Sequence, residues 1–191
     1  MFPGSTTPWK PTRAQLEAAR GTTVPDLVAP GLNVVFCGIN PGLYTAAIGH
    51  HFGRPGNRFW KVIHLAGFTE RQVSPFDERS LLDVGVGITN LVPRATAAAS
   101  ELTPLELREG VQRVEALACK FAPRYVAFLG MLAYRGATGR RTAALGLQPE
   151  RMCESRLWLL PNPSGLQARY QMPELVELFD ELRRAAFNDD G

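Results

Sequence analysis

A short apolar run followed by a glycine-bracketed turn is the feature that most constrains the fold of this chain. Residues 34–37 (Val-Val-Phe-Cys) are apolar throughout, which predicts a fully buried strand of a parallel sheet. Gly38 and Gly42 bracket the turn that follows, and Pro41 fixes one backbone dihedral within it. Asn40 is thereby placed at the carboxyl end of a strand, where open α/β sheets form their ligand crevice. The alternative is that the Asn40 side chain only caps its own turn.

Apolar and helical patterns alternate along the rest of the chain. They predict further strands at residues 81–92, 125–129 and 156–160, and helices at 12–20, 57–66, 103–120, 131–138 and 173–186. Strands that alternate with helices predict a three-layer α/β/α sandwich with a short, mainly parallel central sheet. Residues 43–56, which contain His50 and His51, and the basic residues 139–154 are expected to be loops.

Composition limits the class of protein and its partners. The 191 residues are 45% hydrophobic and 20% charged, which is typical of one globular domain, here residues 25–191 after a peripheral N-terminal arm of residues 1–24. No apolar run reaches membrane-spanning length and no signal-peptide pattern is present, so we expect a cytoplasmic protein without a membrane partner. A net charge of +3 mildly favours a polyanionic partner.

The cysteines and glycines exclude several common sites. Cys37, Cys119 and Cys153 are far apart and form no C-x-x-C pair, which argues against zinc and iron–sulfur sites and predicts reduced thiols, with Cys37 in the core. The pattern Gly85-x-Gly87 is followed by Asn90, which breaks the dinucleotide-binding fingerprint, and the chain has no phosphate-binding loop motif. A nucleotide-binding enzyme of the doubly wound class is therefore disfavoured.

A second turn at a strand end resembles the first one. Residues 161–169 follow the strand expected at 156–160 and turn on Pro and Gly. Because a parallel sheet brings both turns to one edge, Asn40 and Leu166 are expected to face one another across a crevice. Leu166 is an aliphatic side chain on a polar loop tip. It either folds back into the core or acts as a wedge that enters a DNA base stack.

Three motifs, in order and spacing, connect these observations with a known family. The motifs Gly38-Ile39-Asn40-Pro41-Gly42, Gly56-Asn57-Arg58-Phe59-Trp60-Lys61 and Asn162-Pro163-Ser164-Gly165-Leu166 resemble those of the mismatch-specific uracil/thymine DNA glycosylases, in the uracil-DNA glycosylase superfamily. The resemblance covers nearly the whole chain from Ala29 onward. It implies a single-domain α/β/α fold with no metal and no cofactor, and we expect a monomer that acts on double-stranded DNA.

The resemblance also implies a reaction and a set of site residues. A damaged pyrimidine, with uracil opposite guanine preferred, would be flipped out of the duplex and its N-glycosidic bond hydrolysed, which leaves an abasic site for base excision repair. Asn40 would position the attacking water. The residues assigned to base binding are Ile39, Gly42, Thr45 and Phe52, and those assigned to the DNA wedge and its loop are Asn162, Ser164, Gly165, Leu166, Gln167 and Arg169.

Individual residues carry more specific expectations. Phe52 matches the aromatic residue on which the flipped base stacks, with plain core packing as the alternative. Thr45, near C5 of the base, would favour uracil over thymine. Arg54, Arg58 and Lys61 are candidate phosphate contacts, with a solvated surface position as the alternative. His51 matches a position near the water where some relatives also have His, and is expected to be structural.

Asp83 and a non-catalytic role remain open alternatives. Asp83 is expected to be a structural carboxylate at a strand entry, shielded by its apolar neighbours. The other interpretation makes Asp83 a second catalytic group that takes the proton lost by the water, because the amide of Asn40 is a poor proton acceptor. Strand direction weighs against this, because Asp83 begins its strand whereas Asn40 follows another one. The two residues therefore lie at opposite edges of the sheet unless the chain bends at Gly85 or Gly87. A mismatch-binding module that inserts Leu166 without releasing a base is the alternative to an enzyme.

Overall fold

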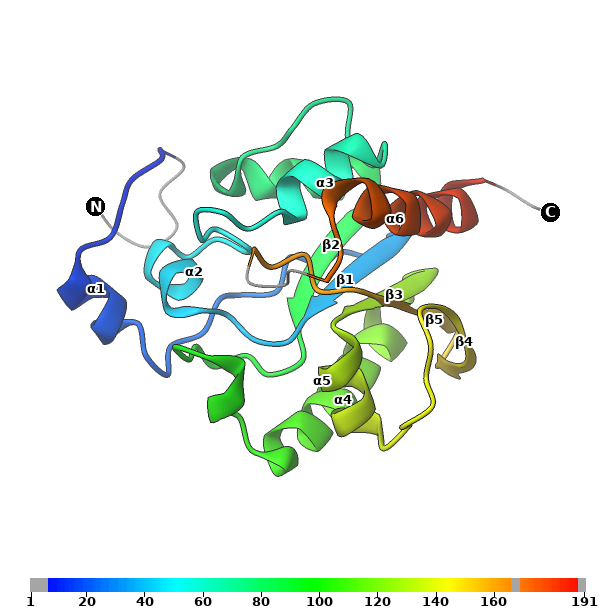
Figure 1. Cartoon of the computed structure of the whole chain (residues 1–191). Coiled ribbons are helices and arrows are strands. Elements are labelled where there is room, and N and C mark those ends of the chain that lie inside the picture. The colour runs from blue at the N-terminus through cyan, green and yellow to red at the C-terminus, as the bar shows by residue number, and fades with distance from the viewer. Residues whose placement is uncertain (1–6, 166–168, 189–191) are drawn as a thin grey trace.

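The apolar runs of the sequence form the inner strands of one sheet. In the computed structural model, which describes residues 7–165 and 169–188, five strands are arranged in the order β2-β1-β3-β5-β4 (Figure 1). The strands are β1 (Val34–Gly38), β2 (Val86–Asn90), β3 (Tyr125–Leu129), β4 (Gly146–Met152) and β5 (Ser155–Leu160). All pair in parallel except β4, which is antiparallel to β5 at one edge. All residues of β1, β2 and β3 are buried, as expected for strands that are covered on both faces.

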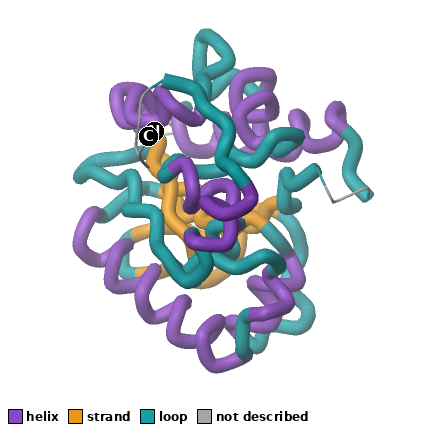
Figure 2. The backbone as a smooth tube through the Cα atoms, turned by 90° about the vertical axis from the view of Figure 1, so that its left-hand side faces the viewer, coloured by secondary structure: helices purple, strands orange, loops and turns teal. Residues whose placement is uncertain are grey.

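Helices cover both faces of the sheet and so confirm the predicted α/β/α sandwich. One layer contains α3 (Phe59–Leu65) and α6 (Met172–Phe187), and the other contains α4 (Pro104–Phe121) and α5 (Met131–Thr138). Figure 2 shows the strands between these two groups of helices. Alternate β1 side chains enter opposite cores: Phe36 stacks with Phe179 of α6, whereas Cys37 joins the core beside α4 and α5. The small helix α1 (Arg13–Ala18) packs against α2 (Leu43–Ile48) at one end of the sheet.

Capping residues set the helix starts where the sequence predicts them. Thr103 accepts a hydrogen bond from the backbone N–H of Glu106, the Glu106 carboxylate accepts one from the backbone N–H of Thr103, and Pro104 takes the first helical position of α4. Thr12 and Gln15 form the same reciprocal pair at the start of α1.

Three segments differ from their predicted structure. Residues 43–56, expected to be a loop, begin with α2, which is too short for its apolar period to be recognised. The strand expected at 81–92 starts only at Val86, because residues 81–84 end a 3-10 helix, η1 (Pro75–Val84), and Gly85 (φ 73°) turns the chain into β2. Residues 139–154 contain β4, an edge strand with exposed polar positions and a register irregularity between Leu147 and Arg151.

Two of the three cysteines are bonded, so the prediction of reduced thiols is wrong for them. Cys119 in the last turn of α4 forms a disulfide with Cys153 in the turn between β4 and β5. Cys37 is free and buried in the core, as predicted, and burial raises the pKa of its thiol. The bond ties the β4–β5 hairpin to a helix of the neighbouring layer.

Reduction of this disulfide is expected to lower the stability of the fold. The bond closes a loop with a sequence separation of 34, for which the chain-entropy estimate of its stabilisation is roughly 3–4 kcal/mol. Chemical unfolding with and without reductant measures the effect. The Cys119→Ser variant should match the reduced protein and no longer respond to reductant. Equal stability of the oxidised and reduced protein would contradict the stabilising role.

Candidate active site

A cavity opens at the sheet edge where the chain topology predicts a ligand site. β1 has β2 on one side and β3 on the other, so the direction in which successive strands are added to the sheet reverses at β1. At such a switch point a crevice forms beyond the carboxyl end of the strand. The cavity there has a volume of about 360 Å³. Its walls come from the turn after β1, from segment 45–57, from the end of β2, from residues 96–99 and from the turn after β5. The turns after β1 and β5 thus share one cavity, as expected.

Hydrogen bonds fix the orientation of the Asn40 amide. Its Nδ2 lies 3.2 Å from the carbonyl oxygen of Pro41, 3.1 Å from that of Arg94 and 2.7 Å from Thr96 Oγ1. The Thr96 hydroxyl donates its own hydrogen to the carbonyl oxygen of Ala98 at 2.8 Å, so toward Asn40 it can only accept. All three partners of this amide atom are therefore acceptors, which requires nitrogen there. Oδ1, the acceptor of the amide, has no partner among the described residues and is available to a water in the cavity.

A buried carboxylate holds the chain on the opposite wall. Glu78 of η1 accepts the backbone N–H of His51 at 2.7 Å, and its other oxygen lies 3.0 Å from His50 Nδ1. The carbonyl oxygen of His51 accepts the indole N–H of Trp60 at 3.2 Å. These bonds fix the backbone immediately before Phe52, a residue that stands in the left-handed region with φ 51°. The loop that presents Phe52 is thus held by polar contacts to both backbone groups of His51.

The ring of Phe52 is supported from below and exposed above. It stacks on Phe59 with ring centroids 4.1 Å apart and also lines the cavity. The backbone at Gly38 passes close by, because a Cβ there would lie 2.6 Å from Asn90 Oδ1 and 3.4 Å from the Phe52 ring. Only glycine leaves this part of the cavity open. Phe52 therefore both packs on the core and offers an aromatic face to a ligand.

His51 and Asn90 form a neutral pair at the base of the cavity. His51 Nε2 lies 2.9 Å from the carbonyl oxygen of Pro25, which can only accept, so Nε2 carries the hydrogen. Nδ1 is then an acceptor for Asn90 Nδ2 at 3.4 Å. Burial lowers the pKa of His51, against the opposing influence of the carboxylates of Glu78 and Asp26. Neutral His51 thus turns the Asn90 amide so that its Oδ1 stands beside Gly38.

Acid is expected to destabilise the protein through His51. The pKa of His51 is lower in the folded chain than its ordinary value of 6.5. As the pH falls below 6.5, His51 is therefore protonated in the unfolded chain before it is protonated in the folded chain. The contribution of neutral His51 to the free energy of unfolding is fully present above pH 6.5. It is lost as the pH falls further, by up to about 1.4 kcal/mol per pH unit. Unfolding of the protein and of a His51→Asn variant, which keeps an acceptor, measures the difference between pH 8 and pH 5. Parallel curves for the two proteins would contradict the prediction.

The side chain of Arg58 holds the turn after β5. Its guanidinium donates to the carbonyl oxygens of Pro163, Ser164 and Tyr170 at 3.2, 3.1 and 2.7 Å, and its backbone N–H donates to Pro163 as well. The expectation of a phosphate contact is therefore corrected: Arg58 is committed to the loop on both sides of residues 166–168. Gly165 is required beside it, because a Cβ there would lie 2.5 Å from the carbonyl oxygen of Gly56.

The structure brings most of the predicted site residues together. Those that line the cavity are Ile39, Asn40, Gly42, Thr45, Phe52, Asn162 and Ser164, together with Arg54. Gly165 lines an adjoining hollow, and Lys61 is exposed on α3. Arg169 is exposed, with its guanidinium 5.5 Å from the ring centroid of Tyr170. Leu166 and Gln167 lie outside the described residues.

Asp83 does not belong to this site. It is exposed on η1, which precedes β2, whereas the cavity lies beyond the carboxyl end of that strand. The expectation that apolar neighbours shield Asp83 is wrong, because the 3-10 helix turns its side chain outward. With neither burial nor proximity to Asn40, Asp83 has no basis for a catalytic role.

Sequence reasoning missed three polar residues of this region. Asn90 and Thr96 line the cavity, and Glu78 holds the loop before Phe52. The sequence did contain a signal for Asn90. Like Asn40, which follows β1, Asn90 is a polar residue at the carboxyl end of an apolar strand. Glu78 gave no local signal, since its partners are 27 and 28 residues away in the sequence.

The chain matches a known protein family, and its described residues show neither a metal-binding cluster nor a membrane-spanning helix. Among the described residues, no group of three or more His, Cys, Asp or Glu side chains is arranged to hold a metal ion. None of the described helices has the length and apolar character needed to cross a bilayer. A family model described as the uracil DNA glycosylase superfamily matches residues 25–189.

Proposed function

Because this chain belongs to the uracil DNA glycosylase superfamily, we propose that it is a monofunctional uracil-DNA glycosylase directed at mismatched or damaged pyrimidines. The superfamily consists of hydrolases that act on DNA. One observation carries the finer proposal: three acceptors hold the nitrogen of the Asn40 amide, which leaves Oδ1 available in a cavity also lined by the Phe52 ring. This pairs a water-orienting group with a surface on which a flipped base can stack.

The proposed reaction is a hydrolytic displacement at C1′ of the flipped nucleotide. The base stacks on Phe52, and Asn40 Oδ1 accepts a hydrogen bond from the attacking water. The water oxygen forms a bond to C1′ while the C1′–N1 bond breaks, and the electron pair of the C1′–N1 bond leaves with the base. The water proton passes to solvent, because a neutral amide is a poor base, so we expect slow chemistry. Backbone N–H groups near Ile39 and Phe52 stabilise the departing anion.

Two residues explain a preference for uracil. Asn90 directs Oδ1 toward Gly38, where it can accept the N3–H of uracil, whereas cytosine has no hydrogen at N3. Thr45 lines the cavity while it is itself buried, so a thymine methyl group near it would meet a fixed side chain. Uracil opposite guanine should be the best substrate, because a mispaired base costs less to unpair.

Leu166 is proposed as the wedge that fills the space left by the flipped base, although it lies outside the described residues. The Leu166→Ala variant is expected to lose more activity on a U·A duplex than on a G·U duplex, because flipping a well-paired base costs more. Single-turnover rates on the two duplexes measure the ratio. Equal losses on both substrates, or none, would show that Leu166 is not a wedge.

One incubation tests the proposed activity. A G·U duplex labelled on the uracil strand is incubated with excess protein and then treated with alkali, which cleaves the strand only at abasic sites. We expect cleavage at the uracil position and none in a G·C control duplex. A protein that retains the G·U duplex in a binding assay but leaves it uncleaved would instead be a mismatch-binding module.

A further inference from the structure

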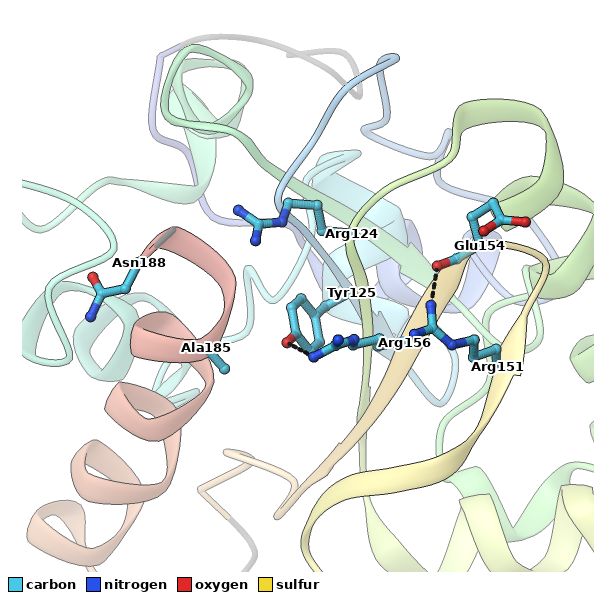
Figure 3. A pocket seen from close by; sticks show the side chains of 7 residues that line it. All are labelled: Arg124, Tyr125, Arg151, Glu154, Arg156, Ala185 and Asn188. Atoms are coloured by element: carbon cyan, nitrogen blue, oxygen red, sulfur yellow. Dashed lines mark hydrogen bonds between the residues drawn. The ribbon is translucent and has the colours of Figure 1, made fainter. Parts of the chain in front are cut away.

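We propose that the sheet carries a second ligand site, a pocket for an oligophosphate group at the end opposite the candidate active site. The pocket has a volume of about 340 Å³ and is lined by Arg124, Tyr125, Arg151, Glu154, Arg156, Ala185 and Asn188 (Figure 3). These residues come from the start of β3, from the β4–β5 hairpin and from the last turn of α6. None of them lines the cavity that contains Asn40.

Two arginines of this pocket lie opposite one another on neighbouring strands. Arg151 and Arg156 are direct partners in the antiparallel β4–β5 pair, so both side chains project from the same face of the sheet. Arg151 donates to the backbone carbonyl oxygen of Glu154 at 3.0 Å, and Arg156 to the Tyr125 hydroxyl at 3.3 Å. In the part of the chain that the structure describes, neither forms an ion pair. Like charges directly opposite one another are destabilising, and a bound anion would remove that repulsion.

A third guanidinium makes the pocket suitable for a multiply charged anion. Arg124 lines the same pocket, and its carbonyl oxygen accepts the backbone N–H of Arg156 at 2.9 Å, which fixes the two residues side by side. Among the described residues of the lining, Arg151 and Arg156 stand against one acidic side chain, that of Glu154, so these two arginines alone give the site a positive excess. Guanidinium groups match the geometry of phosphate oxygens and bind them through paired hydrogen bonds.

Size and rigidity narrow the ligand class. Pockets for small molecules span about 300–1,000 Å³, and this one lies near the lower limit. Among the described residues of the lining, only Tyr125 and Ala185 are apolar or aromatic, so the ligand is recognised through charge and not through an apolar group. The Cys119–Cys153 disulfide fixes the hairpin turn between Arg151 and Glu154 and thereby holds the pocket open in advance. A chain of two or three phosphates, free or as part of a nucleotide, fits these properties.

The position of the pocket keeps it apart from DNA bound at the active site. The strands between the two sites are five or six residues long, which is roughly 16–20 Å. In Figure 1 the C-terminal end of α6 lies on the opposite side of the sheet from α2. A duplex docked at the carboxyl edge of the sheet therefore leaves this pocket accessible.

Calorimetric titration with tripolyphosphate, and separately with a nucleoside triphosphate, tests the proposal at constant ionic strength. We expect one site per chain and a Kd at least about tenfold higher in the double variant Arg151→Gln, Arg156→Gln. The matched control is Arg79→Gln, Arg108→Gln, which removes the same charge from exposed positions that line neither cavity, and it should bind as the unmodified protein does. Tighter binding of the nucleotide than of tripolyphosphate identifies a nucleotide as the source of the phosphates, and the reverse identifies free oligophosphate.

Thermal unfolding gives a readout that does not depend on any enzymatic activity. Without ligand, the Arg151→Gln, Arg156→Gln variant should melt at the same temperature as the unmodified protein or higher, because the like-charge pair is gone. Tripolyphosphate should raise the melting temperature of the unmodified protein but not of this variant. Equal binding by both proteins, or equal weakening in the control variant, would overturn the proposal. So would a parallel loss of binding to uracil-free duplex, which would make the arginines a DNA contact.

Discussion

Asn40→Ala is expected to lower the single-turnover rate of uracil release by about 100- to 1,000-fold while binding of the G·U duplex stays nearly unchanged. The magnitude is that of removing one positioned polar group from a reacting centre. The reason is geometric: the Asn40 nitrogen is held by three acceptors, so the oxygen that remains is the group available to a water. Rates at saturating protein and a separate binding titration measure the two effects.

Thr96→Val is the matched control for this prediction. It removes one of the three acceptors that hold the Asn40 amide but keeps the amide itself. We expect an intermediate loss of rate, about three- to tenfold, because the orientation of Oδ1 becomes less well defined. Full activity of Asn40→Ala would refute its role. A Thr96→Val loss as large as that of Asn40→Ala would place the function on the hydroxyl instead.

Arg58→Lys is expected to reduce activity by about 10- to 100-fold, with the larger loss on a U·A duplex. The Arg58 guanidinium reaches three carbonyl oxygens on both sides of residues 166–168, and an ammonium group cannot span them. The described residues on either side of the proposed wedge then lose their anchor, and flipping a well-paired base suffers most. Single-turnover rates on U·A and G·U duplexes measure the loss, and thermal unfolding reports whether the fold is retained.

Arg54→Lys provides the control for Arg58→Lys. Arg54 is exposed and lines the same cavity, and among the described residues its guanidinium donates to no backbone carbonyl oxygen. The same substitution there should change the rate by no more than a few fold. Full activity of Arg58→Lys, which keeps the positive charge, would show that Arg58 acts through its charge, and equal losses on the two duplexes would contradict its role in holding the loop.

The parts of the fold buried between two layers could be predicted from the sequence. β1 and β3 are continuous apolar runs because helices cover both of their faces, and the bounds of β3 were predicted to the residue. β4 could not be predicted in this way, because it is an edge strand that contains Pro149 and that exposes Leu147 while it buries the polar Gln148. α2 has only six residues, which is too few to establish a helical period.

The candidate site was predictable where function depends on a local turn and not where it depends on distant partners. Asn40 could be identified because it lies in a motif directly after a strand, and Phe52 because the family resemblance assigns an aromatic residue to its position. The bonds of Arg58 connect residues more than 100 positions apart, so nothing near Arg58 distinguishes a loop anchor from a phosphate contact. Asp83 was misjudged for a related reason, since the 3-10 helix that exposes it has no strong sequence signature.

A crystal structure with a G·U duplex that contains 2′-fluoro-2′-deoxyuridine tests the central claim most directly. The fluorine slows breakage of the glycosidic bond, so the complex before hydrolysis can be observed. We expect the uracil ring outside the helix and stacked on Phe52, with one water bound to Asn40 Oδ1 and directed at C1′. A uracil that remains paired within the duplex, or a flipped base whose C1′ lies away from Asn40, would contradict the assignment of this cavity as the active site.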